Sequence, residues 1–116
     1  MVQTAEQKLL AKLQRELETL QESLDKFATK FAEDPAYALS WGHDTFEKAA
    51  RQRKVRGVIV ALESGKTIAD VRELLTSDVL HRAKYPAHST SVTSNLIEQY
   101  ELAASADLLS DLRHYA

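Results

Sequence analysis

Apolar residues recur along the first third of the chain with alternating spacings of three and four residues. This stripe comprises Leu10, Leu13, Leu17, Leu20, Leu24, Phe27 and Phe31. Such heptad spacing places every member on one face of an α-helix and is typical of helices that pair with another helix. Residues 4–33 are therefore predicted to form one long amphipathic helix. It ends at Asp34 because a residue before proline avoids the α region.

A second segment carries two apolar groups that lie out of phase with each other. The first group is Phe46, Ala49 and Ala50, and the second is Val55, Val58, Ile59 and Leu62. The pattern predicts a short helical turn over 36–41, a break at Gly42 and a long helix over 44–64. Asp44 or Thr45 is the expected N-cap of this helix, because a short side-chain oxygen there accepts a backbone N–H.

Two glycines mark the later part of this segment. Gly57 lies inside the predicted helix, where glycine costs about 1 kcal/mol relative to alanine. Close approach of another helix would explain why a glycine stands there. Gly65 directly follows the helix and suits the C′ position, where a left-handed backbone is common.

The remaining chain is predicted to be helical in shorter pieces. Thr67 and Asp70 have the spacing of a capping box, with aspartate in place of the usual glutamate. They begin the segment 67–84, which we expect to form two short helices that part after Leu75. A last helix is expected over 90–115, because hydroxyl-bearing residues that suit an N-terminus precede a long apolar pattern.

All of these elements are helices, and few residues would interrupt them. The 116 residues include three glycines and two prolines, fewer than a β-sandwich of this length needs for its turns. A helix of about 30 residues is roughly 45 Å long, whereas a compact domain of this size has a radius of gyration of about 13 Å. We therefore predict a single all-α domain over 1–116, built as an elongated bundle of four to five helices.

Cysteine usage and hydropathy indicate the compartment. The chain has no cysteine, which excludes disulfides and thiolate metal sites and suits a reducing environment. The N-terminal residues lack the apolar stretch of a signal peptide, and the longest apolar run, Val58 to Leu62, is too short to cross a bilayer. We expect a cytoplasmic protein that has no membrane partner.

Charge is distributed unevenly, although the net charge is only −2. Residues 1–47 carry −4, residues 48–84 carry +5, and residues 85–116 carry −3. The middle segment holds the candidate nucleic-acid contacts Arg51, Arg53, Lys54 and Arg56. These side chains point around most of a helix, so ion pairs with the acidic outer helices are the favoured explanation. A helix-turn-helix over 65–84 would need a glycine in its turn, and the sequence supplies none there.

Candidate catalytic and metal-binding residues are few. The four histidines, His43, His81, His88 and His114, do not pair at the spacing of a helical metal site. The neighbours His43 and Asp44 could be a ligand pair or an oriented base, but we favour a helix-start cap beside a solvated imidazole. The hydroxyls among residues 89–94 lack a nucleophile elbow and suit a helix N-terminus. We therefore predict no catalytic residue, no metal and no cofactor.

The apolar stripe is the strongest functional signal, because a face of five leucines and two phenylalanines requires a cover. We expect a helical interaction or adaptor module that acts through its first and last helices. It would self-associate as a homo-oligomer or bind another helical protein. Trp41, beside the expected helix break, would usually fill the end of the core, and it is also a candidate contact for a partner. The alternative is a small nucleic-acid-binding regulator that uses the segment 48–84.

Overall fold

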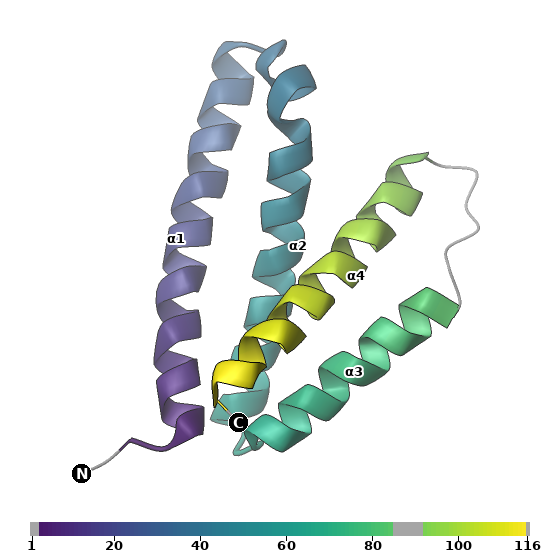
Figure 1. The fold of residues 1–116 in the computed structure, drawn as a ribbon. Helices are drawn as coiled ribbons and strands as arrows, with labels where there is room; N and C mark the ends of the chain where they lie inside the picture. Colours follow the sequence, from purple (N-terminus) through teal and green to yellow (C-terminus); the bar gives the residue numbers. More distant parts are fainter. Residues whose placement is uncertain (1–2, 85–91, 116) are drawn as a thin grey trace.

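The computed structural model describes residues 3–84 and 92–115, and these residues form an all-helical bundle (Figure 1). Its elements are α1 (Ala5–Glu33), α2 (Tyr37–Glu63), α3 (Ile68–Lys84), α4 (Val92–Asp111) and the 3-10 helix η1 (Leu112–Tyr115). The molecule measures 51 × 34 × 21 Å and has a radius of gyration of 15.9 Å. The prediction of an elongated all-α bundle is confirmed.

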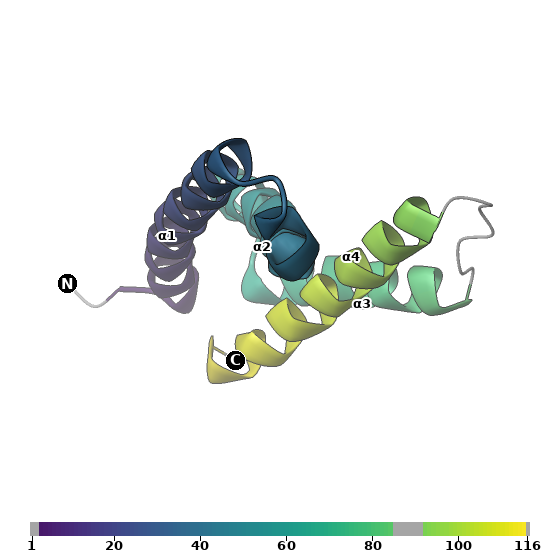
Figure 2. The same ribbon diagram turned by 90° about the horizontal axis from the view of Figure 1, so that it is seen from above.

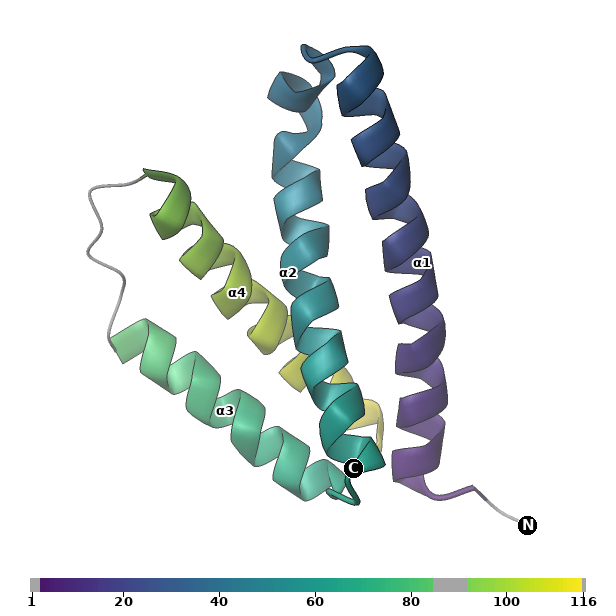
Figure 3. The same cartoon turned by 180° about the vertical axis from the view of Figure 1, so that it is seen from behind.

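The helices form two antiparallel pairs that share one end. Helix α2 packs against α1 on one side and against α4 on the other, and α4 also packs along α3 (Figures 1 and 2). Helices α2 and α3 diverge from the turn that joins them. Seen from behind, α4 crosses the back of the wedge between α2 and α3 (Figure 3). Helix α4 therefore backs one side of this wedge.

The hydrophobic core lies at the shared end of the two helix pairs. It combines the first half of α1, the last half of α2, the first half of α3 and the C-terminal residues. Its buried members are Leu9, Leu13, Leu20, Val55, Val58, Ile59, Leu62, Ile68, Val71, Leu75, Leu108 and Leu112. Away from this core the two helix pairs diverge from each other (Figure 1).

The ends of α1 agree with the prediction. Thr4 is the N-cap: its Oγ1 accepts from the backbone N–H of Gln7, and the Gln7 side chain accepts from the backbone N–H of Thr4. The helix ends before Asp34, as expected from Pro35. Leu9 lies outside the heptad stripe and is nevertheless fully buried, because the shared core reaches beyond that stripe.

The predicted break at Gly42 is wrong. Helix α2 begins at Tyr37 and runs unbroken through Gly42, and neither Asp44 nor Thr45 caps it. The Thr45 hydroxyl instead donates to the carbonyl of Trp41 within the helix. Packing of the first turns of α2 against α1 offsets the helix penalty of one glycine, which is only about 1 kcal/mol.

The prediction of two short helices over 67–84 is also wrong, because α3 is one continuous helix. No glycine or proline lies between Leu75 and Lys84, and the helix packs along α4. The predicted capping box is present: Thr67 and Asp70 exchange two backbone-to-side-chain hydrogen bonds at 3.0 and 3.1 Å. Gly65 has a φ of +91°, which confirms the left-handed position expected after α2.

Helix α4 starts at Val92, within the range expected from the sequence, and η1 completes the predicted C-terminal helix. Residues 85–91, which include His88 and the first predicted capping hydroxyls, lie outside the described residues. Among the helices that the structure describes, none combines the length and the apolar composition that crossing a membrane requires.

Candidate functional site

The first residue of the predicted basic surface, Arg51, bridges α1 and α4. Its guanidinium donates to both carboxylate oxygens of Glu16 at 3.1 and 3.0 Å and to Asp111 Oδ2 at 2.9 Å. Burial by itself would lower the pKa of Arg51, but the hydrogen bonds and charges of Glu16 and Asp111 raise the pKa above its ordinary value. The charge of Arg51 is thus neutralised inside the chain.

The next two cations of the run pair with a buried carboxylate of α4. Arg53 Nε donates to Glu101 Oε1, and Lys54 Nζ lies 3.4 Å from Glu101 Oε2. Lys54 also donates to Asp78 Oδ2 on α3 at 3.1 Å. The buried position of Glu101 is explained by these two partners, because a buried charge without a partner is strongly unfavourable.

Asp78 joins three helices through one carboxylate. It accepts from Lys54 of α2, from Arg82 one turn along α3 at 3.0 Å, and from the Ser105 hydroxyl of α4 at 2.6 Å. Burial alone would raise the pKa of Asp78, but these hydrogen bonds outweigh it and hold the pKa below its ordinary value of 3.8. Arg82 also pairs with Glu98 of α4. The carboxylates that pair with Lys54 and Arg82 therefore come from both α3 and α4.

These ion pairs involve most of the cations of the predicted nucleic-acid surface. Of its four members, Arg51, Arg53 and Lys54 each bind a carboxylate of another helix. Arg56 is exposed, and the described residues give it no ion pair. A helix-turn-helix over 65–84 is excluded as well, because α3 has no turn after Leu75. The sequence-based explanation of intramolecular charge pairing is therefore confirmed for three of the four cations.

The seven stripe residues of α1 divide according to their distance from the core. Leu13 and Leu20 are buried in the core. Leu10 and Leu17 are half-buried against it. Leu24, Phe27 and Phe31 are half-buried nearer the tip of the α1–α2 hairpin. Much of the cover that the stripe requires comes from α2 of the same chain. A role of the stripe as an interface between molecules stays a prediction.

Aromatic side chains gather at the tip of the α1–α2 hairpin. Phe27 and Phe31 of α1 lie 6.4 and 5.7 Å from Tyr37 of α2, measured between ring centroids. Trp41 stacks on Tyr37 at 5.9 Å and remains largely exposed. This cluster packs the hairpin tip far from the main core, and Trp41 contributes to it from its outer edge.

A groove of about 310 Å³ lies between α2 and α3, and Ser105 of α4 also lines it. We call it the α2–α3 groove. Its lining is apolar towards the joining turn and ionic towards the wide end, and it comprises Arg53, Lys54, Gly57, Val58, Ala61, Val71, Leu74, Leu75, Asp78 and Ser105. A concave site of mixed apolar and polar lining is the common form of a binding surface.

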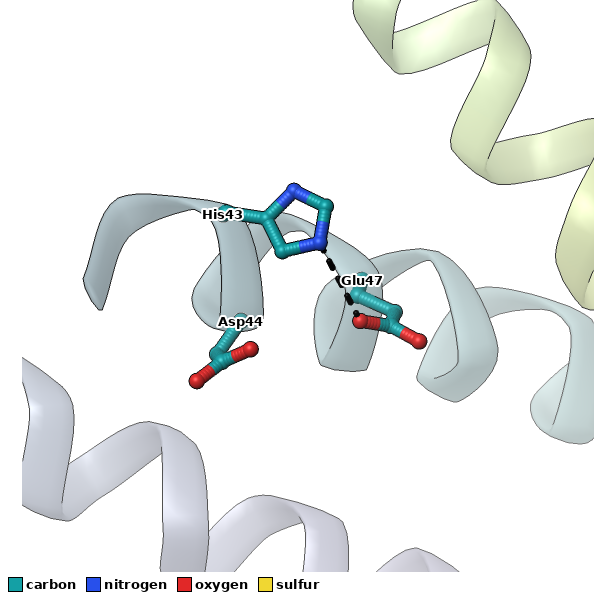
Figure 4. A group of neighbouring side chains, drawn as sticks. All are labelled: His43, Asp44 and Glu47. Carbon is teal, nitrogen blue, oxygen red and sulfur yellow. Dashed lines mark ion pairs between the residues drawn. The ribbon is translucent and has the colours of Figure 1, made fainter. Parts of the chain in front are cut away.

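A second arrangement of functional groups lies on the first half of α2, where His43, Asp44 and Glu47 are neighbours (Figure 4). Their nearest nitrogen and oxygen atoms all lie within 4.8 Å of one another. His43 Nε2 is 3.7 Å from Glu47 Oε2, and its Nδ1 forms a hydrogen bond with the Tyr100 hydroxyl of α4. From the sequence we favoured a helix-start cap beside a solvated imidazole here, with a ligand pair or an oriented base as the alternative. The sequence prediction considered only pairs of histidines. The signal for this cluster is the four-residue spacing between His43 and Glu47.

Comparisons with known proteins add no functional assignment. No protein-family model matches the chain, and no curated protein or solved structure is significantly similar to it. Function must therefore be argued from the two sites themselves, the α2–α3 groove and the cluster around His43.

Proposed function

We propose that this chain is a helical protein-interaction module that self-associates, with a helix of a second copy lying in the α2–α3 groove. Exposed apolar residues near the groove support this proposal. Leu74 lines the groove and is 59% exposed, and on α2 Val60 follows Gly57 by three positions and is 62% exposed. Single exposed apolar residues are ordinary, but an exposed leucine in the lining of a groove is typical of an interaction surface. A cytoplasmic location, suggested by the absence of cysteine, is part of the proposal.

Gly57 is the observation that carries the proposal. A Cβ atom added at this position would meet nothing within 4 Å among the described residues. No close contact with the described part of the chain therefore accounts for a glycine that weakens α2 by about 1 kcal/mol. Packed helices have axes roughly 8–10 Å apart, and small side chains permit the shorter separations. A helix from a second molecule in the groove would use the space that Gly57 leaves.

Size-exclusion chromatography with light scattering tests the proposal. The wild-type chain should show a mass at least twice its monomer mass of 13.0 kDa at micromolar concentration. Gly57→Leu should shift it to the monomer without loss of helix content, because leucine favours the helix and fills the groove. Gly42→Leu is the matched control, since Gly42 is also helical and open but lies away from the groove.

Two outcomes would contradict the proposal. A mass of 13.0 kDa at every concentration would exclude self-association. An oligomer that survives Gly57→Leu but dissociates in Leu24→Glu, with helix content retained, would place the interface on the α1 stripe instead. Leu24 suits this comparison because it belongs to the stripe but lies outside the buried core.

A further inference from the structure

We infer that His43, Asp44 and Glu47 form a binding site for a divalent transition-metal ion on the surface of α2. The inference is independent of the α2–α3 groove, which none of these residues lines. The three side chains are on one rigid helix at positions i, i+1 and i+4, so both carboxylates can reach an ion beside the imidazole. Figure 4 shows the imidazole and the Glu47 carboxylate facing each other, with Asp44 on the adjoining side of the helix.

The separation of the ligand atoms suits an ion between them. Zn–N and Zn–O bonds of about 2.1 Å at a tetrahedral angle place two ligand atoms about 3.4 Å apart. His43 Nε2 and Glu47 Oε2 are 3.7 Å apart, which a small rotation of the Glu47 side chain closes. Both side chains are about two-thirds exposed, so such a rotation meets little resistance.

Tyr100 supplies the support that a histidine ligand needs. A metal-bound histidine usually donates its second ring N–H to a neighbouring acceptor, which sets its tautomer and orientation. His43 Nδ1 is hydrogen-bonded to the Tyr100 hydroxyl, so Nε2 is the nitrogen directed to Glu47. The Tyr100 ring is itself stacked on Phe46, with 6.4 Å between ring centroids. Helix α4 thus holds the imidazole in place from a second element.

The ligand chemistry selects the class of ion. Imidazole nitrogen favours zinc, copper, iron and nickel, whereas calcium and magnesium prefer oxygen ligands alone. The site opens on a groove of about 350 Å³ that Asp44 and Glu47 line together with Asp107 and Asp111 of α4. These carboxylates outnumber the two cations of the groove, Lys48 and Arg51, and favour a cation there. Three protein ligands leave at least one coordination position for water or for a group of another molecule.

Calorimetric titration of Zn²⁺ into the metal-free full chain tests the inference. We expect one ion per chain, loss of saturable binding in His43→Ala, and affinity at least about tenfold weaker in Glu47→Gln. Tyr100→Phe keeps the aromatic ring but removes the hydrogen bond, and should weaken binding about tenfold, at the lower end of the usual effect of such supporting residues. His114→Ala, which removes an exposed histidine of η1, is the matched control and should bind like the wild type.

Substitution with Co²⁺ gives a readout that does not depend on stability. A visible absorption band typical of a nitrogen ligand should appear on titration and be absent in His43→Ala. Circular dichroism of each variant confirms that the helices are intact. No saturable Zn²⁺ binding, or binding that is equal in His43→Ala and in the wild type, would overturn the inference. Equal losses in His43→Ala and His114→Ala would show unspecific histidine binding and would overturn it as well.

Discussion

Replacing Asp78 by alanine is the most direct test of the charge network, because this one carboxylate joins α2, α3 and α4. The Ser105 hydroxyl is completely buried and would lose its acceptor, at a cost of about 2 kcal/mol. Lys54 and Arg82 would keep Glu101 and Glu98 as partners, so the loss of their bonds to Asp78 adds only about 1 kcal/mol. The better helix propensity of alanine offsets about 0.5 kcal/mol of this destabilisation.

The net expectation for Asp78→Ala is a free energy of unfolding lower by about 2.5 kcal/mol. For a domain of this size, this corresponds to a melting temperature lower by about 10 °C. Urea titration and thermal melting, both followed by far-UV circular dichroism, measure the two quantities. Glu73→Ala on the exposed face of α3 is the control, because it makes a similar helix change without touching the network. A loss no greater than that of Glu73→Ala would show that the network contributes nothing to stability.

Three further predictions concern pH, nucleic acid and the glycines. Because the pKa of Asp78 is lower in the folded chain, its stabilisation is complete above the ordinary pKa of 3.8 and is lost as the pH falls towards the folded pKa. The free energy of unfolding, measured by urea titration, should therefore fall less steeply with decreasing pH in Asp78→Ala than in the wild type. Fluorescence anisotropy should detect no DNA or RNA binding at physiological salt. Tight, strongly salt-dependent binding that Arg53→Glu with Arg56→Glu abolishes would favour the nucleic-acid alternative. Gly65→Ala should destabilise by about 1 kcal/mol because of its positive φ, whereas Gly42→Ala should stabilise by about 0.5–1 kcal/mol, both measured by urea titration.

Features that depend on neighbouring residues could be predicted from the sequence. The beginning and end of α1, the capping box of Thr67 and Asp70, and the left-handed Gly65 all involve partners within a few positions. The prediction of a helix break at Gly42 was wrong because it considered local helix propensity without the packing of α2 on α1. The glycine penalty of about 1 kcal/mol is smaller than the stabilisation that the packing of a helical turn can supply.

The candidate sites depend on residues that are distant in sequence. Charge sums along the chain predicted that acidic helices would neutralise the basic run, but they could not indicate that Asp78 and Glu101 would be its partners. Tyr100 lies 57 positions from His43, so its support of the imidazole follows only from the packing of α4 on α2. The spacing of His43 and Glu47, in contrast, is local and could have been recognised from the sequence alone.

The position of the core also determines when it can form during synthesis. Leu9 and Leu108 belong to the same buried cluster, although they are 99 positions apart in the chain. The α1–α2 hairpin can pair early, but its apolar end stays uncovered until the C-terminal residues arrive. Closing so long a segment loses chain entropy before the core contacts form, and this slows folding. Until α4 is synthesised, the nascent chain therefore exposes the part of this apolar end that Leu108 and Leu112 later cover, and a chaperone that binds short apolar segments would find it there.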